Sequence, residues 1–424
     1  MKKHILGAYR ILSGVYADGT YSNMALNGDS VTDMSTKLVY GVLENDVKTE
    51  YIINSLVDKK PQRAVSVLLK IGVYALLNLT DVPQFAIVSE CVEAAKSIGK
   101  GGAGGFINAV LKKVARGEYK LPDESSEDYL SVTYSKPRWF VDKLIAQYGR
   151  KTAVEILSAQ SEHLEHIRVN GRLSSVGEVT KKLERAKESY TLSEVGGIIA
   201  RGTDSVKRMF DDGLVTYQSP SSMLAVQALA PKDGSQILDL CSAPGGKAVY
   251  ISELCPHSTV YAGELHPHRI SLIQKYKNRM HVPNVKAVQL DATKLKDEWV
   301  EKFDFVLVDA PCSCFGTFLK HPDVFLSRGE GDILSLQATQ KLILANAAKY
   351  LKRGGVLVYS TCTLFEEENG EVVDSLLSSD KFRLEHISAV DKIDGGKHKD
   401  NDGRVQILPH GEYDGFYIAR LMKE

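Results

Sequence analysis

Short β-rich runs separated by helical stretches fill the chain after Pro231, and this alternation leaves few folds open. The runs cover residues 236–241, 259–264, 286–290, 303–308, 355–360 and 415–421. Strands that alternate with helices form parallel βαβ units. We therefore predict an α/β domain with a Rossmann-like, doubly wound and mostly parallel sheet. Ligands bind such sheets at the carboxyl ends of the strands, near the point where the strand order reverses.

The chain before about Gly117 has a helical periodicity instead. Apolar residues spaced i, i+3, i+4 and i+7 begin at Ile5, and the dense apolar stretch 64–77 has the character of a buried central helix. Strand signals are nearly absent from this part. We predict an all-α domain over residues 1–120.

Between these parts lies a segment of mixed character. Residues 118–135 are polar and acid-rich, which is typical of a linker. From Lys136 to Phe210 there are 14 Lys and Arg against 9 Asp and Glu, a net charge of +5 (14 − 9) that suits contact with phosphates. We predict a small α+β linker domain over 121–212, followed by the α/β domain over 213–424.

Composition narrows the setting in which the chain works. The formal net charge is zero, and no apolar run approaches the length of a membrane span. Six dispersed cysteines are too few for a disulfide framework and indicate a reducing compartment. We expect a cytoplasmic protein, a monomer with no membrane contact, whose thiols stay free for chemistry.

The first predicted strand runs into a glycine-containing loop that suits a cofactor. After Cys241 come Ser242, Ala243, Pro244, Gly245, Gly246 and Lys247. Two glycines there let the backbone approach a ligand closely. The loop matches neither GxGxxG nor GxxxxGK[ST], which disfavours NAD and ATP.

Acidic residues end the next three predicted strands. Glu264 can accept hydrogen bonds from both ribose hydroxyls of a nucleoside, Asp291 is placed to meet an adenine amino group, and Asp309 ends the fourth strand. Each alone is more often a cap or turn residue. Together they favour a bound nucleoside, and S-adenosyl-L-methionine fits because its sulfonium needs no phosphate site.

Two cysteines follow neighbouring predicted strands at the same edge of the sheet. Cys312 follows the fourth strand and Cys362 the fifth. A thiolate that adds to carbon 6 of cytosine makes carbon 5 nucleophilic enough to accept a methyl group, and cations or helix termini nearby would lower the thiol pKa. The alternative is that both are small buried hydrophobes. Cys314 suggests a metal pair with Cys312, but no second CxC or CxxC accompanies it, so we predict no metal.

The motifs of the chain resemble those of the Sun/RsmB (Fmu) branch of RNA cytosine-5 methyltransferases. The resemblance is carried by DLCSAPGGK (239–247), DAPCS (309–313), HPD (321–323), YSTCT (359–363), EEN (367–369) and DGF (414–416). The first domain is similar to the helical RNA-binding fold of NusB through VPQFAIVSECVEAAK (82–96) and GFINAVLKK (105–113), and YSKPRWFVDKL (134–144) and IRVN (167–170) are similar to the family's connecting region.

This resemblance implies roles that the residues alone leave open. It implies that Cys362 forms the covalent adduct, that Cys312 assists product release, and that Asp309 contacts the target base and the cofactor. It also implies that residues 241–247, Glu264 and Asp291 hold S-adenosylmethionine, and that the NusB-like domain helps to recognise 16S rRNA. Chemistry alone does not choose between the two thiols, since DNA cytosine methyltransferases use the Pro-Cys cysteine.

Three alternative functions remain open, and four residues depart from the family pattern. A tRNA cytosine-5 methyltransferase, a DNA methyltransferase and a non-catalytic RNA-binding antitermination or assembly factor are the alternatives. Cys314 stands where glycine is usual and Ser219 where aspartate is usual. Leu319 replaces a common basic residue and Leu326 a frequent aromatic, which bears on RNA docking.

Overall fold

The computed structural model describes residues 1–18, 32–160, 165–378, 381–393, 398–400 and 403–424. It divides into two compact units. The first comprises Met1–Ser158 together with Phe318–Glu330, and the second comprises Ala159–Thr317 together with Gly331–Glu424. Among the described residues, no helix combines the length and apolar character needed to cross a bilayer.

The described part of the first unit is helical, which confirms the predicted all-α fold of the N-terminal domain. Its helices are α1 (Lys2–Asp18), α3 (Asp33–Glu44), α4 (Asp46–Leu56), α5 (Arg63–Asn78), α6 (Gln84–Ser97), α7 (Gly104–Ala115), α8 (Tyr129–Tyr134), α9 (Arg138–Ser158) and α15 (Val324–Ser327). Helix α5 is the predicted central helix, and its residues from Val67 to Leu76 are all buried. A short 3-10 turn, Gly101–Ala103, precedes α7.

The segment expected to be a linker is partly helical and packs against the first unit. Helix α8 ends at Ser135, whose hydroxyl accepts a hydrogen bond from the backbone N–H of Lys48 in α4 at 3.1 Å. Phe140 in α9 contacts the rings of Phe318 and Phe325 at 5.6 and 4.9 Å between centroids. The last third of the segment 118–135 is therefore mostly helical. The first compact unit continues past the predicted domain boundary at residue 120.

The second unit begins with a small antiparallel sheet that carries two helices. Its strands are β1 (Glu165–Val169), β2 (Tyr190–Leu192), β3 (Ile198–Ala200) and β4 (Val215–Tyr217), in the order β2-β3-β1-β4. Helices α10 (Val176–Arg185) and α11 (Asp204–Asp211) complete it. Ser175 and Glu178 form a capping box that starts α10. An α+β arrangement was predicted for this segment.

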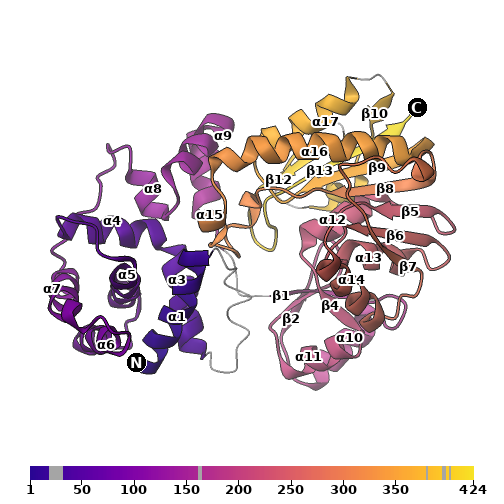
Figure 1. Ribbon diagram of the computed structural model, residues 1–424. Coiled ribbons are helices and arrows are strands. Elements are labelled where there is room, and N and C mark those ends of the chain that lie inside the picture. The colour runs from indigo at the N-terminus through magenta and orange to yellow at the C-terminus, as the bar shows by residue number, and fades with distance from the viewer. Residues whose placement is uncertain (19–31, 161–164, 379–380, 394–397, 401–402) are drawn as a thin grey trace. The chain divides into compact units, whose positions relative to one another are not determined.

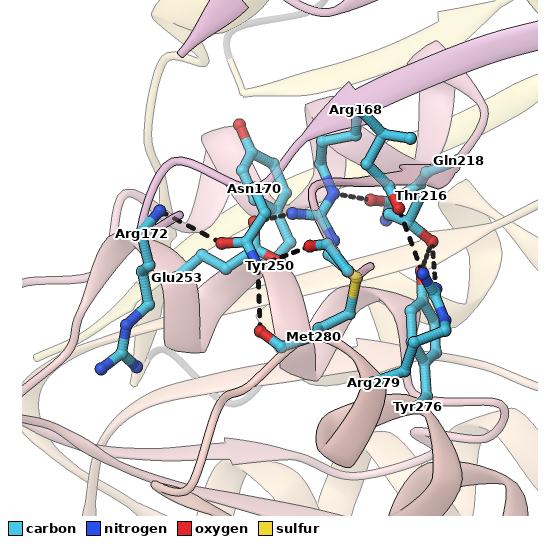
Figure 2. Close-up of polar contacts among 12 residues, drawn as sticks. Arg168, Asn170, Arg172, Thr216, Gln218, Tyr250, Glu253, Tyr276, Arg279 and Met280 are labelled. Carbon is cyan, nitrogen blue, oxygen red and sulfur yellow. Dashed lines mark hydrogen bonds and ion pairs between the residues drawn. The ribbon is translucent and has the colours of Figure 1, made fainter. Parts of the chain in front are cut away.

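A buried arginine joins this small sheet to helix α13 (Gly246–Leu254) (Figure 2). Arg168 of β1 is 2% exposed and forms an ion pair with Glu253. Its Nε donates to Gln218 Oε1 at 2.6 Å, and its guanidinium lies over the ring of Tyr250 at 4.6 Å. Asn170, also buried, donates from Nδ2 to two backbone carbonyls, those of residues 213 and 280. These buried contacts fix the small sheet to the rest of the second unit.

The large sheet has the predicted doubly wound topology (Figure 1). Its strands are β5 (Gln236–Asp239), β6 (Thr259–Glu264), β7 (Val285–Gln289), β8 (Phe303–Asp309), β9 (Leu351–Thr361), β10 (Phe382–Leu384), β11 (His398–Asp400), β12 (Arg404–Ile407) and β13 (Phe416–Lys423). The order is β11-β12-β13-β9-β8-β5-β6-β7, with β10 on β13. Strands β5 to β9 pair in parallel. The last four strands pair antiparallel, and of these the sequence predicted β13 alone.

Helices cover both faces of the sheet, which explains its continuous apolar strands. One core packs α12 (Pro220–Leu229), α13 (Gly246–Leu254) and α14 (Pro267–Arg279) against one face. The other core packs α16 (Glu330–Tyr350) and α17 (Gly370–Leu377) against the opposite face. The strand order reverses between β5 and β8, so the crevice for a ligand lies at their carboxyl ends.

Glu253→Ala tests the buried pair that holds the small sheet. Removing one partner of a buried ion pair leaves an uncompensated charge and costs about 3–5 kcal/mol. We expect a loss of that size in the free energy of unfolding measured with urea. Lys207→Ala is the control, because its pair with Asp204 is exposed and 3.9 Å long, and it should change stability by less than about 0.5 kcal/mol. Equal effects of the two substitutions would contradict this account.

Candidate active site

The loop after β5 is shaped by glycine. Gly245 has a φ of +110°, and α13 starts at the next residue, so its first backbone N–H groups face the end of the sheet. Gly263 of β6 lies against the same loop, since an added Cβ there would come within 2.9 Å of the Leu240 carbonyl oxygen. The loop is therefore pressed between neighbouring strands at the reversal point, where the sequence predicted a cofactor.

A buried carboxyl in this loop was missed by the sequence analysis. Asp239, the last residue of β5, is fully buried, and its carboxylate lies within hydrogen-bond reach of the Ser242 hydroxyl and the Ala248 backbone N–H. Burial raises the pKa of Asp239 to about 7. Buried polar groups therefore gather at the start of α13. Such groups need polar surroundings, so this loop fits a polar cofactor.

The two acidic residues predicted to hold a nucleoside lie at the same edge of the sheet. Glu264 ends β6, is 5% exposed and pairs with Arg269 at 3.3 Å. Asp291 lies two residues beyond β7 and is more exposed. The Thr293 hydroxyl donates a hydrogen bond to Asp291 at 2.6 Å, and Lys294 forms an ion pair with it. These contacts, with Thr293 the stronger, lower the pKa of Asp291. Both carboxylates are therefore held at the edge where β5 ends.

Asp309 connects the loop 241–247, here called the cofactor loop because a cofactor is predicted there, to the thiols. Its Oδ2 pairs with Lys247 Nζ at 2.7 Å, and its Oδ1 accepts a hydrogen bond from Ser360 Oγ at 2.8 Å. Burial lowers the pKa of Lys247, but the Asp309 carboxylate outweighs it and the pKa is raised, so the lysine stays charged. The pair spans the crevice from α13 to β8.

The two predicted catalytic cysteines are brought together. Cys312 Sγ and Cys362 Sγ lie 3.3 Å apart, because β8 and β9 are paired in parallel and both thiols follow their carboxyl ends. Cys314 Sγ lies 4.0 Å from Cys312 Sγ, and the three sulfurs lie within 4.8 Å of one another. Cys91 is buried in the core of the first unit, and Cys255 is buried in a core of the second unit.

The loops that carry these thiols are braced by buried polar groups. Ser313 hydrogen-bonds Thr363 across the two loops at 2.8 Å, and its backbone N–H donates to Glu368 at 2.8 Å. Gln340 of α16 donates to the Pro311 carbonyl at 2.9 Å and to Glu368 at 3.1 Å. The EEN motif suggested Glu368 by resemblance but gave it no role. Its role in the structure is to hold both thiol loops in register.

The electrostatics of the thiols differ from the expectation. Neighbouring Cys314 and Cys362, followed by burial, raise the pKa of Cys312 well above its usual value. The hydrogen bond with Cys312 lowers the pKa of Cys362, but Cys314, burial and the Asp309 charge outweigh it and raise that pKa too. The expectation of thiols activated by nearby cations was wrong for this state. Because the neighbouring thiols and burial oppose a thiolate, the resting cysteines are neutral.

The departures from the family pattern have different structural outcomes. Cys314 has a φ of +63°, a left-handed conformation that explains why glycine is usual there. Ser219 caps α12 by accepting a hydrogen bond from the Ser222 N–H at 3.3 Å, so serine replaces aspartate in a capping role. Leu326 packs against the apolar core of the first unit. Nothing in the structure explains Leu319.

The sheet order, the cofactor loop and the acidic strand ends define a Rossmann-like methyltransferase that uses S-adenosylmethionine. The family model of 16S rRNA methyltransferase RsmB/F matches residues 226–422, and that of the NusB family matches residues 6–116. The chain belongs to the RsmB-type methyltransferase family, joined to a NusB-family domain. This confirms the resemblance, the fold class and the cofactor predicted from the sequence.

Relatives match over nearly the whole chain. A Bacillus subtilis (strain 168) protein named "Probable ribosomal RNA small subunit methyltransferase B" is 32% identical over 428 residues, 95% of each chain. The ribosomal RNA small subunit methyltransferase B of Cronobacter sakazakii is 31% identical, over 92% of this chain and 90% of its own.

Two solved structures are also similar. The crystal structure of PH0851 covers 100% of this chain and 99% of its own with a TM-score of 0.82 at 24% identity, a likeness of fold. A methyltransferase homolog from Pyrococcus horikoshii covers 71% of this chain and 100% of its own with a TM-score of 0.61 at 27% identity.

Asp239→Asn tests the buried carboxyl by the pH dependence of stability. The folded-state pKa of about 7 lies above the unfolded value of about 3.9, so the folded state holds the proton more tightly. Its contribution to stability is therefore full below pH 4 and is lost as the pH rises to 7, by about 1.4 kcal/mol for each pKa unit. We expect the asparagine variant to lose less unfolding free energy than the unsubstituted protein between pH 5 and pH 8.

The control for this experiment is Glu298→Gln, which removes a carboxylate whose side chain is 71% exposed. Its curve of unfolding free energy against pH should run parallel to that of the unsubstituted protein. A parallel curve for Asp239→Asn as well would show that the Asp239 carboxyl titrates as it does in the unfolded chain, against this account.

Proposed function

We propose that this protein transfers a methyl group from S-adenosylmethionine to carbon 5 of a cytosine in 16S rRNA, through a covalent bond between Cys362 and carbon 6. The observation that carries the proposal is the thiol pair at the end of β8 and β9, with Cys312 Sγ 3.3 Å from Cys362 Sγ. Two thiols at one active site suit a reaction that must both form and break a carbon–sulfur bond.

The first step is addition of the Cys362 sulfur to the ring. Carbon 5 of cytosine is too weak a nucleophile to attack a sulfonium methyl group. A new bond from sulfur to carbon 6, formed as the thiol proton passes to ring nitrogen N3, turns the ring into an enamine that can attack. S-adenosylmethionine supplies the methyl group to carbon 5. Asp309, held by Lys247 and Ser360, is the group we assign to the N3 and exocyclic amine side of the base, where charge develops during addition.

The second step breaks the adduct. The proton on carbon 5 passes to solvent by way of the Cys312 sulfur, the electrons of that bond form the carbon 5–carbon 6 double bond, and the Cys362 sulfur departs and takes up a proton. We assign Cys312 to this release, because its sulfur lies 3.3 Å from that of Cys362. The raised pKa values keep both thiols protonated until a target base is bound.

We assign the cofactor to the crevice between β5 and β8. Residues 241–247 would hold it at the start of α13, with the buried Asp239 beside them. Glu264 and Asp291 would meet its ribose and its adenine. Asp309 lies between cofactor and base in this assignment, since its two oxygens reach Lys247 of the loop and Ser360 of the thiol strand.

The rRNA substrate is proposed from the relatives and the NusB-family domain. Two full-length relatives carry the name ribosomal RNA small subunit methyltransferase B. A cytosine inside a helix cannot reach a crevice at a sheet edge without leaving its stack, so we expect the target in a loop or exposed strand.

The roles of the two thiols are separated by their alanine variants. Cys362→Ala should abolish methyl transfer, by at least about 1,000-fold, because no sulfur remains to activate the ring. Cys312→Ala should still form the adduct but release it slowly. The protein–RNA complex should therefore survive denaturing electrophoresis with Cys312→Ala and be absent with Cys362→Ala. The reverse pattern would assign attack to Cys312.

The substrate is tested by bisulfite sequencing of total RNA from a strain that lacks the gene. We expect one 16S rRNA cytosine to lose protection from conversion, and its protection to return with the intact gene but not with Cys362→Ala. Loss of protection in tRNA instead would identify the transfer RNA alternative. Unchanged protection in all RNA, together with no cofactor binding in calorimetry, would support the non-catalytic factor.

A further inference from the structure

We propose that Cys312, Cys314 and Cys362 form a binding site for one thiophilic divalent cation, of which Zn²⁺ and Cd²⁺ are examples, and that its occupancy blocks the Cys362 sulfur. The three sulfurs, here called the thiol cluster, come from two loops that the sheet brings together. Metal binding itself does not depend on the proposed methyl transfer. The inhibition that follows from it rests on that function.

The spacing of the thiol cluster suits tetrahedral thiolate coordination. Bonds of about 2.3 Å from zinc to sulfur, at tetrahedral angles, place two sulfurs about 3.8 Å apart. The distances from Cys312 Sγ are 3.3 Å to Cys362 Sγ and 4.0 Å to Cys314 Sγ, and no pair exceeds 4.8 Å. Changes of up to about 1 Å in the sulfur–sulfur distances therefore bring the cluster to coordination geometry.

From the sequence we predicted no metal, because no second CxC or CxxC motif accompanies Cys312 and Cys314. The structure supplies the third ligand differently, from the loop after β9, through the parallel pairing of β8 and β9. Three protein ligands with a fourth position left to water are sufficient for zinc. The prediction of no metal thus rested on local spacing, which does not detect ligands from separate strands.

Cys314 is a second, independent observation. It holds a φ of +63°, which glycine adopts freely and a side chain adopts at a cost of about 1 kcal/mol. The methylation chemistry proposed above uses two thiols and assigns this third sulfur no step. Strain that persists at an active site points to a role for the side chain concerned. Coordination of a cation is a role that a sulfur in this position can perform.

The loops that carry the thiol cluster are held before any cation arrives. Ser313 joins Thr363 across the loops, and the Gly316 N–H donates to the Cys362 carbonyl at 2.9 Å. Gln340 and Glu368 hold the same segment from behind. Because the sulfurs are already close, binding requires little ordering of the chain, which favours affinity.

Binding follows a simple balance of atoms. Each thiol that coordinates releases its proton to solvent, and three sulfur–metal bonds form. The lone pair that Cys362 would use against carbon 6 is then engaged in a metal bond. Inhibition should be reversed when a chelator removes the cation, because no covalent bond has been made to carbon.

The test is calorimetric titration of the full-length protein with ZnCl₂, paired with the ultraviolet thiolate-to-metal charge-transfer band that CdCl₂ produces. We expect one site per chain. Cys314→Gly should weaken binding by more than about 100-fold, since loss of an outer partner of a metal ligand already costs 10–100-fold. Glycine also relieves the positive φ, so this variant should fold normally. Cys362→Ala should weaken binding as strongly.

Cys255→Ala is the matched control, because it removes a thiol of the same unit that lies outside the cluster. Its affinity should equal that of the unsubstituted protein. Equal zinc affinity in Cys314→Gly, or absence of a one-to-one site, would overturn the proposal.

Methylation assays distinguish the failure of this proposal from failure of the proposed function. Each variant is compared with its own rate in chelator. Zinc should inhibit the unsubstituted protein and Cys255→Ala at concentrations about 100-fold below those that inhibit Cys314→Gly. Equal inhibition would overturn the blocking role. If no methylation is found with any RNA, the proposed function fails, while calorimetry and the charge-transfer band still decide whether the cation binds.

Discussion

The parallel pairing of β8 with β9 is the constraint on which the site depends. Its register sets Asp309 opposite Ser360, so the segments that follow β8 and β9 leave the sheet at neighbouring positions. Cys312 and Cys362, fifty residues apart in sequence, come within 3.3 Å as a result. A shift of this register by one residue would turn the side chains of one strand to the other face of the sheet and separate the thiols.

Buried polar groups gather at two places on this edge of the sheet, around the thiol loops and in the loop after β5. Around the thiol loops they are mutually satisfied, as in the contacts of Glu368 with Ser313 and Gln340, and such networks hold backbone in one conformation. In the loop after β5, the buried Asp239 and Ser242 lie at the start of α13. Protein contacts thus hold the thiol loops, and the loop after β5 brings buried polar groups to the edge of the sheet.

The neutral state of the thiols follows from the same packing. The Asp309 charge opposes a thiolate on Cys362. Lys247 offsets that charge through its 2.7 Å contact with Asp309. In the proposed mechanism, hydrogen bonds from the target base to Asp309 would change the charge felt by the Cys362 sulfur. Three sulfurs placed this close together also form a site for a thiophilic cation, which would block Cys362.

The sequence by itself determined the helical first domain, the positions of β5 to β9 and the loop at 241–247, because hydrophobic periodicity and glycine placement are local properties. It also placed Cys312 and Cys362 at one edge, since strand ends of parallel neighbours coincide. Only the tertiary structure decided the remainder. The antiparallel strands at the end of the chain, the packing of 318–330 with the first unit, the pKa of Asp239 and the third sulfur at Cys314 all depend on contacts between distant residues. Burial, register and loop conformation arise from such contacts, and no local pattern encodes them.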